Sequence, residues 1–388
     1  MQTARRIAAI PPYLFAEIDR KLAAKRAQGV DVITFAIGDP DLPTPDFIVE
    51  ALTEAARDPA THQYPSYFGL PAFREAIAAF YQRRFGVSLD PGSQVLPLIG
   101  SKEGIAHLPW AFVDPGDPVL VTEPGYPVYE VGTLLAGGEP VYLPLRADEG
   151  WFPRFERLER SVADRAKLLW LGYPSNPTAA VATLEQFETA VRFAADHDLL
   201  LAHDNAYSEI TYDGFVAPSV LQVPGAMEVA VEFGSLSKSC NMTGWRIGWV
   251  VGNPVAIEAL GRVKTNIDPG IFNAVQRAGV AALTSGLPHL PALVATYQRR
   301  RDRIIEVFRE AGWKVEPPRG ALYVWLPTPP GESSVAFTSR LLDDAGVVVV
   351  PGTGYGPSGE GYVRLSLTIP DDRLEEGCER VRKALLTT

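Results

Sequence analysis

The stretch from KLLWLG (Lys167–Gly172) to LLLAH (Leu199–His203) decides the fold class. Both ends are short, continuous apolar runs, as expected of strands that are buried on both faces of a parallel sheet. Between them, Leu184–His197 is amphipathic, and Thr183 with Gln186 forms a capping box that is typical of a helix start. The stretch therefore predicts a strand, a covering helix and a second, parallel strand.

The same alternation extends in both directions along the chain. Further strand-like runs lie at Gln94–Ile99, Pro118–Thr122, Val229–Gly234 and Ile247–Gly252. Helix-like segments lie between them at Lys102–Val113, Val128–Ala136 and Val255–Lys264. We predict an α/β protein whose large domain holds a mostly parallel sheet flanked by helices, with antiparallel pairing of the last strand as an open alternative.

The two ends of the chain differ from this pattern. Residues 1–44 are proline-rich and loop-like around a short helix near Leu14–Gln28. The C-terminal part has a helical segment at each end and strand-like runs between them: His289–Ala311, Gly320–Leu326, Val347–Val350, Gly361–Leu367 and Asp371–Leu386. We predict a large domain over residues 45–283, a smaller α+β domain over 284–388, and an N-terminal arm, 1–44, that joins the smaller domain.

The composition argues against several classes of protein. The 388 residues are 46% hydrophobic and carry a formal net charge of −10, so a nucleic-acid partner is not expected. Two cysteines far apart in the chain, Cys240 and Cys378, argue against a disulfide framework and favour a reducing, cytoplasmic location. The sequence shows neither a metal-binding spacing of Cys and His nor an apolar run long enough for a membrane span, so we expect no metal and no membrane partner.

The residues around Lys238 indicate a site for a phosphate-bearing ligand. Lys238 follows a strand-like run, is flanked by Ser235 and Ser237, and precedes Arg246 by a short segment. A lysine that forms a Schiff base must be partly desolvated, so that its neutral amine is available. Arginine can bind a phosphate in a bidentate manner while the two hydroxyls donate. An ordinary surface lysine is the alternative interpretation of Lys238 taken by itself.

Other polar residues also follow strand-like runs. After Gly100, a helix-like segment begins with Ser101 and Lys102, and its first N–H groups can point at an anion. Asp204 also follows a strand-like run, and its carboxylate is costly to bury without a cation, although a residue of a turn is the alternative interpretation. Asn176 follows another run, with a plain Asn-Pro turn as its alternative. Four such residues lie past the ends of four different strands: Ser101, Asn176, Asp204 and Lys238. Open α/β sheets bind ligands at that edge.

From about Pro11 to its C-terminus, the chain resembles the class I/II aminotransferases of fold type I, which depend on pyridoxal 5′-phosphate (PLP). The resemblance rests on motifs at residues 37–41 (IGDPD), 64–70 with Arg74, 123–127 (EPGYP), 175–178 (SNPT), 204–207 (DNAY), 235–248 (SLSKSCNMTGWRIG) and 363–366 (VRLS). It implies a seven-stranded sheet and a homodimer with shared active sites. It also implies ping-pong transfer of an amino group between an amino acid and a 2-oxo acid.

The resemblance further implies a role for each matching residue. The catalytic groups would be Lys238, which carries PLP and moves the proton at the substrate Cα, Asp204, which pairs with the ring nitrogen, and Tyr207. Asn176 and Tyr207 would bind the phenolic oxygen of PLP, and Tyr126 would stack on its ring. The phosphate group would be held by Gly100, Ser101, Lys102, Ser235, Ser237, Arg246 and, from the neighbouring subunit, Tyr64. The substrate would be bound by Asn176 and by Arg364, which would hold the α-carboxylate with help from the backbone of Gly38.

Two blocks, residues 97–108 and 235–248, are most similar to bacterial LL-diaminopimelate aminotransferases and their relatives, which implies a place in lysine biosynthesis with glutamate and 2-oxoglutarate as partners. Tyr67 departs from the plant-type pattern, which has an acidic residue there for the distal ammonium. Alanine, aspartate or aromatic donors are therefore the alternatives. Tyr13, Tyr67 and Tyr355 are candidates for the distal pocket, with loop or interface packing as their alternative role.

Two other classes of function compete with amino transfer. A PLP-dependent C–S lyase or decarboxylase would use the same cofactor residues but would need no 2-oxo acid acceptor. A non-catalytic, aminotransferase-like sensor would resemble fusions with an N-terminal DNA-binding module. The short segment before Gly38 and the acidic charge disfavour the sensor.

Overall fold

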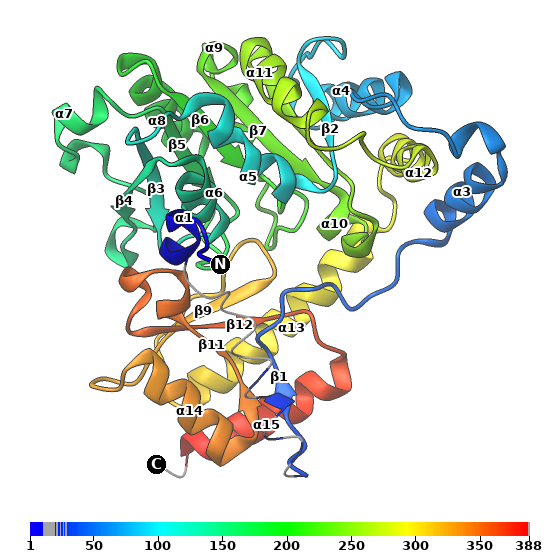
Figure 1. Ribbon diagram of the computed structural model, residues 1–388. Coiled ribbons are helices and arrows are strands. Elements are labelled where there is room, and N and C mark those ends of the chain that lie inside the picture. The colour runs from blue at the N-terminus through cyan, green and yellow to red at the C-terminus, as the bar shows by residue number, and fades with distance from the viewer. Residues whose placement is uncertain (11–19, 21, 24, 26, 28, 387–388) are drawn as a thin grey trace.

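The main sheet of the protein has seven strands flanked by helices (Figure 1). The computed structural model describes residues 1–10, 20, 22–23, 25, 27 and 29–386. The strands follow the order β2 (Val95–Leu98), β8 (Gly248–Gly252), β7 (Ala230–Ser235), β6 (Leu200–Asp204), β5 (Leu168–Gly172), β3 (Pro118–Glu123) and β4 (Glu139–Pro144). Neighbouring strands pair in parallel, except that β8 is antiparallel to β2 and to β7. The predicted fold class is confirmed, as is the antiparallel alternative for β8.

Most strands of this sheet are buried on both faces, as their continuous apolar sequences predict. The edge strand β4 is the exception, because only Leu143 among its residues is buried. Its sequence, EPVYLP, therefore lacks a continuous apolar run, and the sequence analysis missed it.

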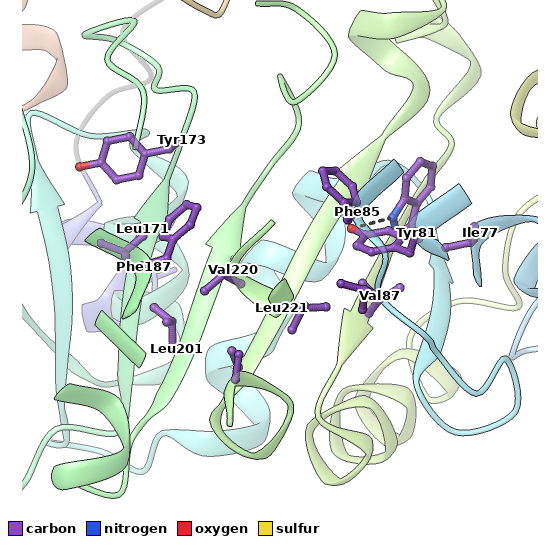
Figure 2. Close-up of a cluster of buried hydrophobic side chains, with 14 of the residues drawn as sticks. Ile77, Tyr81, Phe85, Val87, Leu171, Tyr173, Phe187, Leu201, Val220 and Leu221 are labelled. Carbon is purple, nitrogen blue, oxygen red and sulfur yellow. Dashed lines mark hydrogen bonds between the residues drawn. The ribbon is translucent and has the colours of Figure 1, made fainter. Parts of the chain in front are cut away.

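Helices cover both faces of the sheet. One face is covered by α5 (Ser101–Phe112), α6 (Val128–Ala136) and α11 (Pro254–Thr265). The other is covered by α4 (Pro71–Phe85), α8 (Leu184–Asp196) and α12 (Asn273–Thr284), with α3 (Asp46–Arg57) packed on α12. Figure 2 shows side chains of this second layer, from Phe187 and Leu201 to Tyr81 and Phe85. The predicted capping box of α8 is present, since Thr183 accepts from the Gln186 N–H at 3.2 Å.

A smaller sheet lies below the main one in Figure 1, against the longest helix, α13 (Leu290–Glu310). It contains β11 (Val350–Pro351), β12 (Tyr362–Ser366) and β9 (Tyr323–Pro327), all antiparallel, and is packed by α14 (Ser334–Ala345) and α15 (Asp371–Leu386). The N-terminal segment joins this part of the protein, because β1 (Ile33–Thr34) pairs in parallel with β10 (Val347–Val348).

The described chain also contains four short α-helices, α1 (Arg5–Ala9), α7 (Arg160–Ala163), α9 (Ala226–Val229) and α10 (Leu236–Ser239), and several single-turn 3-10 helices. Helices α3, α4, α12 and α14 were not predicted from the sequence, and the single strand expected at Val347–Val350 is divided between β10 and β11. The helix expected near Leu14–Gln28 lies largely outside the described residues. Among the helices that the structure describes, none combines the length and apolar character needed to cross a membrane.

A buried polar cluster centred on Glu232 lies in the middle of the main sheet. The Glu232 carboxylate, fully buried on β7, accepts hydrogen bonds from the Tyr81 hydroxyl (2.9 Å), the Ser219 hydroxyl (2.9 Å) and the Val220 N–H (3.0 Å). It also lies 2.9 Å from Nδ1 of His203, whose other ring nitrogen lies 3.1 Å from the Tyr173 carbonyl. Burial opposes ionisation, yet the bond to His203 and the other donors hold the pKa of Glu232 below its usual value.

We expect Glu232→Ala to lower the free energy of unfolding by about 3–5 kcal/mol, because it leaves several buried donors without their acceptor. Since the folded-state pKa of Glu232 is depressed, its stabilisation is present above the unfolded-state pKa and is lost as pH falls through the folded-state pKa. Urea denaturation of the wild type, Glu232→Ala and the exposed control Glu188→Ala, at neutral and acidic pH, measures both effects. Equal losses in the two variants would contradict this account.

Candidate active site

A cavity of about 400 Å³ lies where the carboxyl ends of the central parallel strands face the smaller sheet. It brings together twelve residues that the sequence analysis selected: Gly38, Ser101, Lys102, Tyr126, Asn176, Asp204, Tyr207, Ser235, Ser237, Lys238, Arg246 and Arg364. Many of them follow a strand of the main sheet directly, while Arg364 lies on β12 of the smaller sheet. The carboxyl ends of parallel strands share one edge, which explains why residues far apart in sequence meet here.

Lys238 lies on the single turn of α10, directly after β7. The Ser235 hydroxyl caps this turn by accepting from the Ser237 N–H at 3.1 Å. The Lys238 amine donates to the carbonyl of Gly38 at 3.0 Å. Burial lowers the pKa of Lys238, since the charged ammonium loses hydration in the cavity wall. Lys238 is therefore not a surface lysine, and its neutral form is more accessible than that of an exposed amine.

Asp204 is the last residue of β6 and faces the cavity. The Tyr129 hydroxyl donates to one carboxylate oxygen at 3.0 Å, and the Ala206 N–H to the other at 3.3 Å. Burial raises the pKa of Asp204, although these two bonds work against the rise. Within the described residues Asp204 forms no salt bridge. A cationic group in the cavity would supply the missing partner and lower the cost of burying this charge.

The opposite part of the cavity carries several anion-binding groups. Helix α5 begins at Ser101, so its first N–H groups and its dipole are directed to this region. Gly100 has a positive φ of 74°, and a methyl group there would lie 2.3 Å from a terminal guanidinium nitrogen of Arg246. Gly100 thus makes room for this guanidinium. Burial and then the neighbouring Arg246 lower the pKa of Lys102, so an anion bound between the two cations would relieve their repulsion.

Arg364 is almost fully buried, at 1% exposure, and is held on several sides. It donates to Oδ1 of Asn176 and to the Ala36 carbonyl, both at 2.7 Å. Its guanidinium carbon lies 4.1 Å from the ring centre of Tyr323 and 4.9 Å from that of Tyr355. A guanidinium fixed in this way is suited to bidentate binding of a carboxylate.

Two further predicted residues contact other aromatic side chains. The Tyr207 hydroxyl lies 2.9 Å from the Tyr323 hydroxyl. The Tyr126 ring meets the Tyr129 ring edge-on, with centroids 5.7 Å apart, and Tyr129 in turn stacks on Trp170. Burial, followed by the proximity of Tyr323, raises the pKa of Tyr207, so this phenol keeps its proton at neutral pH.

Some predicted residues do not line the cavity. Tyr64 and Tyr67 are 86% and 49% exposed and are absent from the lining of this single chain's cavity. Tyr355 lies behind Arg364, and Gly100 lies behind Arg246. Tyr13 lies outside the described residues. In the described ranges no three His, Cys, Asp or Glu side chains gather as a metal site would require.

The sequence analysis missed several residues of the cavity: Ile37, Asp39, Tyr129, Thr243 and Tyr323. Tyr129 had a usable signal, because one helical turn after Tyr126 places it beside that residue. For Tyr323 the sequence offers no such signal. It begins a plain apolar strand of the smaller sheet, and its neighbours come from the packing of the two sheets.

Known proteins resemble this chain over nearly its whole length. An LL-diaminopimelate aminotransferase of Moorella thermoacetica is 54% identical over 99% of both chains, and one of Trichormus variabilis is 52% identical over the same shares. Among solved structures, substrate-bound BacF of Bacillus subtilis has a TM-score of 0.95 at 37% identity, covering 99% of this chain and 98% of its own.

A probable N-succinyldiaminopimelate aminotransferase of Thermus thermophilus superposes with a TM-score of 0.90 at 38% identity, over 96% of this chain and all of its own. The family model "Aminotransferase class I and II" matches residues 30–381, a range that includes all twelve predicted cavity residues. The chain belongs to the PLP-dependent aminotransferases of class I and II.

Proposed function

We propose that this aminotransferase uses LL-diaminopimelate as its amino donor and 2-oxoglutarate as its acceptor. The cavity is the observation that supports amino transfer, because a desolvated lysine (Lys238), a buried carboxylate (Asp204) and a fixed arginine (Arg364) line it together. The donor rests on the relatives that are 51–54% identical over almost the entire chain, whose names all state this activity.

The cavity residues fit PLP by their chemistry. Asp204 lacks the cation that a protonated pyridine nitrogen supplies, and the neighbouring cations Lys102 and Arg246 suit the anion that a phosphate supplies. In this proposal the phosphate is held by Ser101, Lys102, Ser235, Ser237 and Arg246, with Gly100 making room for the arginine. Asn176 and Tyr207 bind the phenolic oxygen, and Tyr126 packs on the ring. When bound, PLP supplies the electron-withdrawing ring that stabilises charge at the substrate Cα.

Lys238 moves the proton at that carbon. Its amine is buried beside the Gly38 carbonyl, and its lowered pKa leaves more of the neutral form that can accept a proton. After accepting the proton, the ammonium can return it to another atom of the bound ligand, and release of the 2-oxo acid product then requires a water molecule to break the bond between its carbon and the amino nitrogen. Asp204 remains ionised against the ring nitrogen throughout.

Arg364 binds the α-carboxylate of the substrate, with help from the backbone of Gly38, which lines the same cavity. Tyr13 and Tyr67 are proposed for the distal end of the substrate, whereas Tyr355 supports Arg364 from behind. A homodimer belongs to the proposal: Tyr64, 86% exposed in one chain, reaches the phosphate site of the other subunit, and Tyr67 approaches by the same route. Tyr67 contributes hydrogen bonding but no charge to the distal ammonium.

The division of the chain is also part of the proposal. We place a large PLP-binding domain at residues 45–283 and a small domain at 284–388, which the arm 1–44 joins through the β1–β10 pair. A cytoplasmic location is supported by Cys240 and Cys378, which are buried, unpaired thiols.

The experiment follows the absorbance of the PLP-loaded enzyme while amino acids are added one at a time. LL-diaminopimelate is expected to convert the lysine-bound cofactor band, and 2-oxoglutarate to restore it. The panel also includes meso-diaminopimelate and lysine, which differ from LL-diaminopimelate at the distal end. Alanine, aspartate and phenylalanine share only the amino acid end that donates the amino group. Faster conversion by alanine, aspartate or phenylalanine would replace the proposed donor. Release of ammonia and a 2-oxo acid without an acceptor would indicate a lyase instead.

A further inference from the structure

The hydroxyl of Tyr323 lies at the meeting point of three functional groups of the cavity. Tyr323 opens β9 and is 2% exposed. Its hydroxyl lies 2.9 Å from the Tyr207 hydroxyl, and its ring packs at 4.1 Å under the guanidinium of Arg364. A methyl group at Gly38 would lie 2.3 Å from the same hydroxyl, so Gly38 leaves the space that this hydroxyl fills.

We propose that Tyr323 is a positioning residue of the reaction, which donates its hydroxyl proton to Tyr207 and supports Arg364 with its ring. The inference rests on the proposed function. It adds a residue that links Tyr207, the proposed partner of the cofactor's phenolic oxygen, to Arg364, which binds the substrate carboxylate. Tyr207 belongs to the DNAY motif and Arg364 to the VRLS motif, and Tyr323 lies in neither.

The direction of the shared hydrogen bond follows from counting protons. Each phenol has one proton, and in the described part of the chain each of these two hydroxyls has the other as its hydrogen-bond partner. If Tyr207 donates its proton to a ligand oxygen in the cavity, the Tyr207 oxygen must be the acceptor from Tyr323. A hydroxyl that accepts a hydrogen bond is a stronger donor, so Tyr323 strengthens the bond that Tyr207 gives to the ligand.

The ring of Tyr323 has a separate role from its hydroxyl. Arg364 lies between the rings of Tyr323 and Tyr355, and its remaining contacts to Asn176 and Ala36 fix its edge. An aromatic face stabilises a desolvated guanidinium and restricts its rotation. Replacing the hydroxyl alone should therefore leave substrate binding almost intact, whereas replacing the ring should weaken it.

The test compares Tyr323→Phe, Tyr323→Leu and a matched control, Tyr212→Phe. Tyr212 is equally buried, and its hydroxyl donates at 2.7 Å to the Ala321 carbonyl beside β9, but it lies outside the cavity lining. The first readout is the pH at which the absorbance of the lysine-bound cofactor changes between its two forms. The second is the separation of KM from kcat with the best donor of the panel.

For Tyr323→Phe we expect the spectral transition to move upward by roughly half to one pH unit, because the unprotonated cofactor oxygen loses hydrogen-bond support. Its KM should stay within about twofold of the wild type, since the ring remains, while Tyr323→Leu raises KM by roughly tenfold. Tyr212→Phe should leave the spectral transition unchanged.

Two results would overturn the inference while the proposed function stands. One is a spectral transition in Tyr323→Phe at the wild-type pH, and the other is an equal shift in Tyr212→Phe. A wild-type protein that forms no absorbance band with PLP would overturn the proposed function, and the inference with it.

Discussion

Lys238→Ala is expected to lose the absorbance band of lysine-bound PLP and to transfer amino groups at least about a thousandfold more slowly than the wild type. Lys238 is the lysine that the fold buries beside the Gly38 carbonyl, and no hydroxyl of the cavity can replace an amine in both binding and proton transfer. Absorbance spectra and single-turnover rates with the preferred donor measure the two losses separately.

The control for this variant is Lys167→Ala, which removes an exposed lysine before β5 and should behave as the wild type. A Lys238→Ala protein that retains the band would assign the cofactor to another amine. Lys102 would be the first to test, since it lines the same cavity and burial has lowered its pKa as well.

Asp204→Asn is expected to have opposite effects on activity and on stability. Activity should fall by roughly a hundredfold or more, because a neutral amide cannot pair with a protonated ring nitrogen. The cofactor-free protein should become more stable at neutral pH by about 1 kcal/mol, because burial makes the charged carboxylate unfavourable before a cation is bound.

The sign of the stability effect follows from the raised folded-state pKa of Asp204. Below the unfolded-state pKa of Asp204, the wild type does not lose stability by burying a charged carboxylate. It loses that stability as pH rises from there through the folded-state pKa. The gain in Asp204→Asn should therefore vanish in acid. Thermal denaturation of both cofactor-free proteins across pH measures it, with Asp196→Asn at the exposed end of α8 as the control. A destabilised Asp204→Asn at neutral pH would show that Asp204 is instead a structural acceptor for Tyr129.

The sequence predicted the central strands well because burial on both faces requires continuous apolar runs. It failed at β4 for the same physical reason, since an edge strand in a partly exposed position needs no such run. Helix α14 was missed because its amphipathic segment stands beside short, irregular strands, where no regular alternation supports it.

The site was predictable to the extent that it follows from sheet topology. Asp204 ends one parallel strand and Lys238 lies in the turn after its neighbour, so their proximity could be inferred from the order of apolar runs alone. The contact between Tyr207 and Tyr323 depends on how the smaller sheet packs against the main one, which local sequence does not encode. Tyr64 and Tyr67 are exposed and lie outside the cavity lining, so their predicted roles do not follow from the fold of one chain.

The residues that line the cavity are spread over most of the chain, from Ile37 to Arg364. Lys238 and Asp204 come from the main sheet and the turn after it, whereas Arg364 comes from β12 of the smaller sheet. The distance between the arginine and the lysine therefore depends on how the two sheets pack against each other. A change in that packing would alter the spacing between Lys238 and Arg364 while leaving Asp204 and Lys238, which belong to neighbouring paired strands, in the same positions relative to each other.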